Sequence, residues 1–359
     1  MATSAVDAIA PAFAHTKQQL LEPFQLSQWA KLALVGMLAG ELTSGGCNVR
    51  SFTLPARTPQ GSDHLLDLPA LPHVDPAVYA GLIAFLVIFG FVFFVLILYV
   101  SSVMRFVLLD AVIARRCEVG RSWSRRHGAG LGYFVWKILL FLVAMVGTVI
   151  FVGVPLAFAL AAGWLKAPKE HMAPLILGGI AMLFLALAFA AAIAVVHVMT
   201  KDFVVPQMAL DDVSAIEGWQ RLLPMLKAEK GGYVGYIALK VVMALATAVV
   251  VGIAATIVVL LMAIPLGGLG AVAILMGKAS GLRWDVYTVS LAVLVGILAL
   301  GFLLYVVSLV SVPAMVFFPA YSLYFFAERY PKLAEVMYPR TAPLPTPLAA
   351  PIPPPLPQG

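Results

Sequence analysis

Charged residues are scarce in this chain: they make up 11% of its 359 residues, whereas hydrophobic residues make up 62%. Roughly a quarter of the residues of a soluble domain are charged, so this shortage, with a mean hydropathy of +1.00, excludes an ordinary soluble protein. The apolar residues form continuous runs and do not alternate with polar ones. In lipid, only helices and closed barrels satisfy every backbone polar group, and continuous runs indicate helices. The predicted fold class is therefore an all-α integral membrane protein.

Cysteines are few and catalytic motifs are missing. The two cysteines, Cys47 and Cys117, are expected on opposite sides of the membrane, which excludes a disulfide between them or a shared metal site. The zinc-protease motif HExxH, the nucleophile motif GxSxG and the Walker A loop do not occur. We therefore expect no catalytic, cofactor-binding or metal site, and the sequence predicts a protein that is not an enzyme.

Six apolar segments are candidates for membrane spans, because a helix needs about 20 apolar residues to cross the hydrocarbon layer. They are residues 27–46, 78–103, 133–165, 174–199, 233–264 and 286–312. The first is short and ends in polar residues, so it either crosses or forms a half-helix buried against its neighbours. Residues 266–277 are apolar but too short to cross, which indicates a surface cap or a re-entrant piece.

The predicted domain organisation has three parts. Residues 1–30 form an amphipathic interfacial segment, residues 31–330 one multi-pass membrane domain, and residues 331–359 a proline-rich, disordered cytoplasmic tail. Apolar side chains of the first part fall near one helical face, which predicts a helix on the membrane surface: Val6, Ile9, Ala10, Phe13, Leu20 and Leu21. A helix packed on protein is the alternative. The tail is either inert or a docking site for a proline-binding module.

Lysines and arginines lie mostly on one side of the predicted membrane. With the N-terminus inside, fifteen of the 23 fall in inside segments, six fall outside, and Lys137 and Lys240 lie within spans. The positive-inside rule then places both termini in the cytoplasm. One cytoplasmic connector would also attract anionic lipid headgroups through Arg115, Arg116, Arg121, Arg125 and Arg126. It lacks a recognisable nucleic-acid-binding fold, so no nucleic-acid partner is predicted.

The two basic connectors, residues 103–137 and 197–240, resemble each other. Aromatic residues recur in both at similar spacings, at Phe106 and Phe203, Trp123 and Trp219, and Tyr133 and Tyr233. This predicts tandem units of span, amphipathic connector helix and span. In the second connector Ser214 and Glu217 form a capping-box pattern, followed by an apolar face of Ile216, Trp219, Leu222, Leu223 and Leu226. Residues 1–46 and 286–330 would each be half of such a unit.

Lysines within the spans are the charges that most suggest function, because an ionisable residue inside the bilayer marks a transport path. Lys137 and Lys240 lie within about two turns of Tyr133 and Tyr233, however, so both can extend to the inner interface. We interpret them, and His197, as interfacial residues. Solvated or helix-capping roles are expected for the four aspartates in or next to the connectors: Asp110, Asp202, Asp211 and Asp212.

A family resemblance rests on three segments. Residues 202–223 read DFVVPQMALDDVSAIEGWQRLL, residues 105–126 read RFVLLDAVIARRCEVGRSWSRR, and residues 7–34 read DAIAPAFAHTKQQLLEPFQLSQWAKLAL. They resemble an uncharacterised family of bacterial multi-pass membrane proteins that is similar to the membrane domain attached to some glycerophosphodiester phosphodiesterases. The hydrolase barrel has no counterpart in this chain. The resemblance therefore implies a bacterial cytoplasmic membrane and an accessory or lipid-associated role.

Two classes of function follow from these observations. The first is a non-catalytic inner-membrane protein that scaffolds a membrane protein partner or organises lipid, which the amphipathic connectors favour. The second is a transporter or channel for an unknown substrate, which the repeat and the proline interruptions near Pro265 and Pro313 favour. An intramembrane enzyme is a third, weaker alternative, since no pair of catalytic groups is expected within the bilayer.

Overall fold

The computed structural model describes residues 4–41, 76–165, 169–279 and 286–338, and the regular elements among these residues are all helical. In chain order they are α1 (Ile9–Leu21), α2 (Leu26–Leu38), α3 (Pro76–Ile113), α4 (Val119–Thr148), the π-helical η2 (Val149–Gly153), α5 (Val154–Ala161), α6 (Met172–Met199), the π-helical η3 (Thr200–Val204), α7 (Val205–Asp211), α8 (Ala215–Ala228), α9 (Lys230–Ala279), α10 (Val286–Ala327) and α11 (Pro331–Met337). The all-α prediction is confirmed for this part of the chain.

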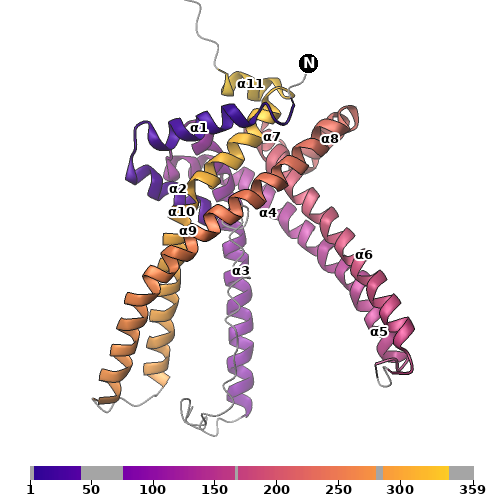
Figure 1. The fold of residues 1–359 in the computed structure, drawn as a ribbon, viewed down its shortest axis with the longest axis vertical. Helices are drawn as coiled ribbons and strands as arrows, with labels where there is room; N and C mark the ends of the chain where they lie inside the picture. Colours follow the sequence, from indigo (N-terminus) through magenta and orange to yellow (C-terminus); the bar gives the residue numbers. More distant parts are fainter. Residues whose placement is uncertain (1–3, 42–75, 166–168, 280–285, 339–359) are drawn as a thin grey trace, which may run out of the picture.

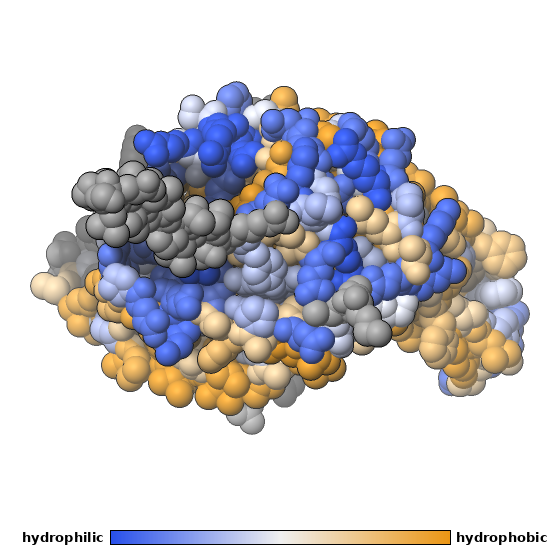
Figure 2. Space-filling view, turned by 90° about the horizontal axis from the view of Figure 1, so that it is seen from above, coloured by the Kyte–Doolittle hydropathy of each residue, from blue (hydrophilic) through white to orange (hydrophobic). Residues whose placement is uncertain are grey.

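The helices gather at one end of the molecule and spread apart toward the other (Figure 1). α1, α7, α8 and α11 lie at the gathered end, which we call the hub end. From it, α9 and α10 run together as one leg, α3 forms a second, and α4, α5 and α6 form a third. Figure 2 looks onto the hub end and shows mainly hydrophilic side chains across it, with hydrophobic ones around the rim. The polar hub end is therefore suited to water and the apolar legs to lipid.

Five helical stretches are long and apolar enough to cross a membrane, so the protein is membrane-embedded: Ile83–Ile113, Val119–Ala161, Met172–Asp211, Lys230–Gly277 and Ser290–Ala327. The first of the six predicted spans forms α2, which has 13 residues. Its length of about 20 Å, at 1.5 Å per residue, falls short of the roughly 30 Å hydrocarbon core. Residues 42–46 of that predicted span lie outside the described residues, which thus hold five span-length helices in place of six.

The apolar segment 266–277 belongs to α9, which continues through Pro265 to Ala279. The prediction of a surface cap or a re-entrant piece is therefore wrong. Proline removes one backbone hydrogen bond from a helix, but in apolar surroundings no alternative to the helix satisfies the neighbouring backbone groups. The 50 residues of α9 extend over roughly 75 Å at 1.5 Å per residue, so this helix includes both hub residues and a complete leg.

Aromatic pairs anchor the legs to the hub at matching places in the two connectors. Phe106 of α3 packs edge-to-face on Tyr133 of α4, with ring centroids 6.0 Å apart. Phe203 of η3 packs edge-to-face on Tyr233 of α9, at 5.3 Å. Such pairs add about 0.5–1.5 kcal/mol beyond burial of their area. Each connector therefore has a phenylalanine packed edge-to-face on a tyrosine, at positions that match in the sequence.

The N-terminal helix α1 packs against α10. His15 is buried on this face, where Nε2 donates a hydrogen bond to the Val112 carbonyl (2.9 Å) and Nδ1 accepts one from the Tyr324 hydroxyl (3.2 Å). Burial, together with the nearby Arg115 guanidinium, lowers the pKa of His15 from its ordinary value of 6.5. The predicted apolar face is only partly buried, since three of its members point outward: Val6, Phe13 and Leu21. One face of α1 therefore packs on protein while another stays available to lipid.

The second connector forms α8 as predicted. The Ser214 side chain accepts a hydrogen bond from the Glu217 backbone N–H at 3.2 Å, which confirms this half of the capping box. The predicted apolar face of α8 is divided, however. Leu222 is fully buried, whereas Ile216 is 60% and Leu223 46% exposed. α8 consequently lies on the hub by one edge and leaves apolar side chains uncovered along the other.

Candidate functional site

A cluster of charged side chains occupies the junction between the hub and the legs. Arg105 of α3 pairs with Glu41, which follows α2, and Lys201 Nζ of η3 lies 2.6 Å from the other oxygen of the same carboxylate. Asp202, the next residue of η3, pairs with Lys240 of α9 and lies 3.9 Å from Arg105. We call Glu41, Arg105, Lys137, Lys201, Asp202 and Lys240 the ionic cluster. Residues up to 199 positions apart in the sequence thus converge on one place.

The local structure explains how η3 contributes to both halves of the cluster. Successive helical residues project about 100° apart, so Lys201 and Asp202 reach different neighbours. Asp202 also accepts a hydrogen bond from the Tyr236 hydroxyl, at 2.9 Å. The wide π turn of η3 is a feature often found at functional sites. It sets a cation and a carboxylate side by side at the end of an apolar span.

Burial makes this cluster energetically demanding. The side chain of Arg105 is 5% exposed, that of Glu41 2% and that of Asp202 1%. Buried charges require partners, because taking an ion out of water is costly. The four cations of the cluster face two carboxylates, so its formal charge is +2. The described residues therefore leave an excess of positive charge where the legs meet the hub.

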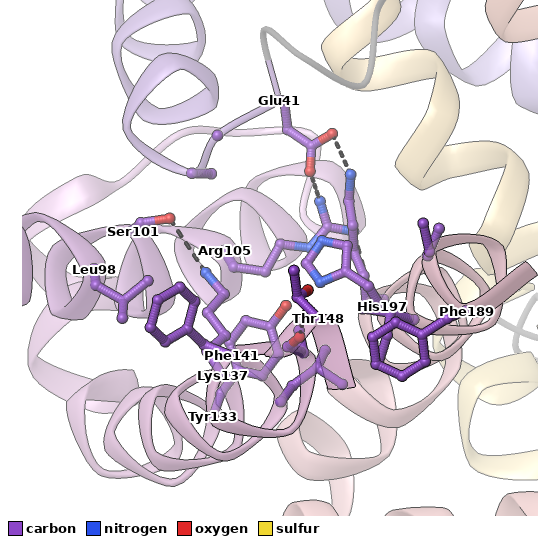
Figure 3. A pocket seen from close by; sticks show the side chains of 18 of the residues that line it. Glu41, Leu98, Ser101, Arg105, Tyr133, Lys137, Phe141, Thr148, Phe189 and His197 are labelled. Carbon is purple, nitrogen blue, oxygen red and sulfur yellow. Dashed lines mark hydrogen bonds and ion pairs between the residues drawn. The ribbon is translucent and has the colours of Figure 1, made fainter. Parts of the chain in front are cut away.

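Lys137 is the cation of the cluster that has no carboxylate partner among the described residues. Its Nζ donates a hydrogen bond to the Ser101 hydroxyl at 3.2 Å and lies 4.8 Å from the centroid of the Tyr133 ring. In Figure 3, Lys137 points from α4 toward α3, beside Arg105. A hydroxyl and a ring face stabilise an ammonium less than a carboxylate does, so Lys137 is available to an anion.

A cavity of about 820 Å³ opens beside the cluster, between α3, α4 and α6. Its polar end is made by Glu41, Ser101, Arg105, Lys137, His197 and Lys201. Apart from Thr148, the wall that follows α4 and α6 away from the hub is apolar and includes Leu140, Phe141, Ala144, Phe189, Ala190 and Ala194. Figure 3 shows the charged groups at one side of this space and the aromatic rings of Phe141 and Phe189 along it. We call this space the amphipathic groove.

The far part of the groove depends on close contact between α4 and α6. A Cβ atom on Gly147 would lie 2.0 Å from Cζ of Phe189, a separation that no packed structure tolerates. Phe189 also packs on Phe151 of η2, with ring centroids 5.1 Å apart. The glycine lets the two helices approach, and the aromatic pair closes the groove between them.

The structure places the predicted charged residues differently from the sequence interpretation. Lys240 pairs with the buried Asp202, a contact that the interfacial interpretation did not include. Asp202 and Asp110 are buried and not solvated; Asp110 binds both Arg125 and Arg126 of α4. These corrections have one cause: the folded hub surrounds residues that the sequence places at a chain connection.

The other two aspartates, Asp211 and Asp212, differ from each other in their surroundings. The Asp211 side chain is 7% exposed and contacts Arg221, Lys332 and Tyr330. Asp212 is exposed, as expected, and ends α7 with a left-handed backbone. Only Asp212 therefore has the solvated, helix-ending role that was predicted for all four.

Sequence reasoning missed Glu41, Arg105 and Tyr236. A signal for the first two exists, since Glu41 directly follows the apolar run 32–40 and Arg105 interrupts the long apolar run 78–113. A charge at the edge of such a run is costly unless it is paired. Nothing in the sequence pattern marks Tyr236, whose hydroxyl is positioned by the packing of α9 on η3.

Cys117, the cysteine within the described residues, is buried in the turn between α3 and α4. Burial raises the pKa of its thiol to about 11, against a smaller opposing effect of Lys31. The thiol is the unreactive form, so Cys117 has the properties of a packing residue. Among the described residues, no group of three or more histidine, cysteine, aspartate or glutamate side chains is placed to hold a metal ion.

These features define a class: a membrane-embedded, all-helical protein whose legs meet at a buried ionic cluster next to an amphipathic groove. The chain belongs to a family of unknown function (DUF7544), whose sequence profile matches residues 3–336. No curated protein and no solved structure matches it. The similarity to the glycerophosphodiester phosphodiesterase membrane domain stays a prediction.

Proposed function

We propose that this protein is a non-catalytic, multi-pass protein of the bacterial cytoplasmic membrane that organises lipid, or a membrane protein partner, at the inner leaflet. The observation that carries this proposal is the separation of the legs from one another (Figure 1). The most hydrophobic stretch of each of the five span-length helices is between 0% and 12% buried within the protein. Legs that bury so little of their surface in one another leave it for lipid or a partner to cover.

The orientation belongs to the same proposal. The hub end carries the two basic connectors and the polar face of Figure 2. Basic segments stay on the cytoplasmic side of a membrane and attract the anionic lipids of the inner leaflet. Both termini then lie in the cytoplasm, where α1 and α11 flank the hub.

The repeat interpretation is also supported by the packing. Residues 1–46 and 286–330 are each interpreted as half of a repeated unit, and α10 packs on both α1 and α2. Joined in this way, the two halves make a third unit beside those of the two internal connectors. Three units around one hub suit a scaffold, because each adds a connector to the same cytoplasmic surface.

The test is the composition of the purified protein. We expect material extracted in a mild detergent to retain phospholipid or a second protein in a fixed molar ratio to the chain. Retention should survive size-exclusion chromatography, after which phosphate analysis and quantitative gel staining give the ratio. If the chain runs alone, with neither lipid nor protein in a fixed ratio, the proposed function is wrong.

A transporter is the second candidate, favoured by the two π-helical interruptions at the groove. η2 contributes Phe151 and Val152 to the wall, and η3 contributes Lys201. Such irregular turns often occur at functional sites. A flux screen in proteoliposomes tests this alternative, since a transport signal abolished by Lys137→Gln or Lys240→Gln would support it. An unchanged signal in both variants would count against it.

A further inference from the structure

We propose that the amphipathic groove binds one anionic phospholipid, with its phosphate against the ionic cluster and an acyl chain between α4 and α6. This inference rests on the proposed function and deepens it, because it assigns the lipid class and the place where the lipid binds. The argument has three steps, which concern charge, shape and the choice of occupant.

The charge step starts from the excess of positive charge in the cluster. Glu41 and Asp202 are engaged by Arg105, Lys201 and Lys240. Lys137 has only neutral partners among the described residues. A second observation points the same way, since the buried Nε of Arg105 has no hydrogen-bond partner there. Both residues line the groove, so an anion entering it meets an uncompensated ammonium beside a guanidinium.

The shape step concerns the apolar part of the groove. Along α4 and η2 its wall runs from Lys137 to Val152, fifteen residues farther along the chain, which is about 22 Å at 1.5 Å per residue. Half of a roughly 30 Å hydrocarbon core is about 15 Å, so the groove is long enough for an acyl chain that reaches the middle of the membrane. The volume of about 820 Å³ lies in the range of about 300–1,000 Å³ typical of ligand sites. The groove therefore matches an acyl chain within one leaflet, with its polar end at the headgroup level.

The choice of occupant follows from combining the two steps. A free anion pairs with the cations but leaves the apolar wall uncovered. An uncharged lipid covers the apolar wall but leaves the cations without an anion. A zwitterionic lipid brings its own cation to a cluster that already carries excess positive charge. A phospholipid with net negative charge meets both requirements, because charge-assisted hydrogen bonds to phosphate are strong and the acyl chain buries apolar surface.

The experiment measures lipid binding to the full-length protein by native mass spectrometry in detergent. Phosphatidylglycerol and phosphatidylcholine with identical acyl chains are titrated separately. We expect one phosphatidylglycerol per chain, bound about tenfold more tightly than phosphatidylcholine. Both lipids offer a phosphate, but the choline of phosphatidylcholine places a further cation beside a cluster with excess positive charge. Glycerol phosphate, added as a competitor, should not displace the lipid, since it lacks the acyl chains.

Two pairs of variants identify the site. Lys137→Gln removes the groove cation that has no carboxylate partner among the described residues. Lys169→Gln makes the same change at an exposed lysine that does not line the groove and lies outside the basic connectors. Ala190→Leu fills the groove, whereas Ala191→Leu makes the same change at the next residue, which does not line it. The first member of each pair should weaken phosphatidylglycerol binding about tenfold or more. The second member should leave it unchanged, and size-exclusion profiles identify any misfolded variant.

Three results would overturn the assignment. Phosphatidylglycerol binding unchanged in both Lys137→Gln and Ala190→Leu would show that the lipid binds elsewhere. Displacement by glycerol phosphate would show that the acyl chain has no part. A copurifying protein lost from Ala190→Leu but kept in Ala191→Leu would assign the groove to a protein. In the first case lipid still copurifies in a fixed ratio, so the proposed function stands while this inference fails.

Discussion

The carboxylate of Asp202 offers the sharpest test of the ionic cluster. Asp202→Asn keeps the side-chain volume and one acceptor oxygen but removes the charge that pairs with Lys240. The formal charge of the cluster then rises from +2 to +3, because Glu41 is left as its one carboxylate. Removing one partner of a buried ion pair destabilises a protein by about 3–5 kcal/mol. At about 1.4 kcal/mol per factor of ten, the ratio of folded to unfolded protein should fall by roughly two to four orders of magnitude.

Asp212→Asn is the matched control, because it makes the same chemical change ten residues away. Asp212 is exposed and has a left-handed backbone, with φ of 53°, a conformation that asparagine also tolerates. We expect its free energy of unfolding to change by no more than about 0.5 kcal/mol. The assay is unfolding by sodium dodecyl sulfate in mixed micelles, followed by tryptophan fluorescence and carried out in parallel on the two variants.

A double variant separates the charge effect from a packing effect. Lys240→Gln added to Asp202→Asn restores the cluster to a formal charge of +2, so part of the lost stability should return. The coupling between two contacting residues is typically about 0.5–3 kcal/mol. If Asp202→Asn and Asp212→Asn unfold at the same detergent concentration, the buried ion pair does not stabilise the hub and the reasoning is refuted.

Three further predictions concern other parts of the hub. Gly130→Ala should destabilise the protein by about 1–3 kcal/mol, since the added Cβ would lie 2.6 Å from Cγ2 of Val103. Gly128→Ala, in open space on the same helix, should be neutral or stabilising. Equal effects of the two changes in the same unfolding assay would contradict this prediction. Folding lowers the pKa of His15, so the unfolded chain takes up the proton at a higher pH than the folded one, and stability should fall as the pH drops below about 6.5. The loss of stability between pH 7.5 and 5.5 should be smaller in His15→Gln. An equal loss in that variant would assign the effect to other groups. The Cys117 thiol should react with maleimide only after unfolding, in a variant whose other cysteine is serine, because burial holds its pKa at about 11; rapid labelling of the native protein would show that the turn is open.

The N-terminal segment shows how far periodicity alone can go. The pattern of residues 4–21 predicts a helix, and α1 occupies Ile9–Leu21. Periodicity also predicts one apolar face, but it does not say what covers each side. In the structure the side bearing His15 packs on α10 and α3, because Val112 and Tyr324 offer hydrogen-bond partners there. The partners come from distant segments, so no local pattern contains them.

In the ionic cluster, too, the sequence shows the residues but not their contacts. The charge of each residue is evident in the sequence, and so is its position near the end of an apolar run. Arg105 and Glu41 are 64 positions apart, and Lys201 and Glu41 are 160 apart. Contacts across such separations depend on how the legs are rotated and shifted against one another. That arrangement decides which cations meet a carboxylate and leaves Lys137 beside a groove.

The sequence by itself determined that this chain is an all-α membrane-embedded protein, because hydrophobic composition and run length act locally and lipid admits few backbone structures. It also determined the start of α8, since a helix cap needs only neighbouring residues. Only the tertiary structure decided that α9 passes through Pro265, that Asp202 is buried with Lys240, and that α3, α4 and α6 enclose a groove with a cationic end. Burial and ion pairing arise when distant segments meet, so they are properties of the packed helices and not of any one stretch of the chain.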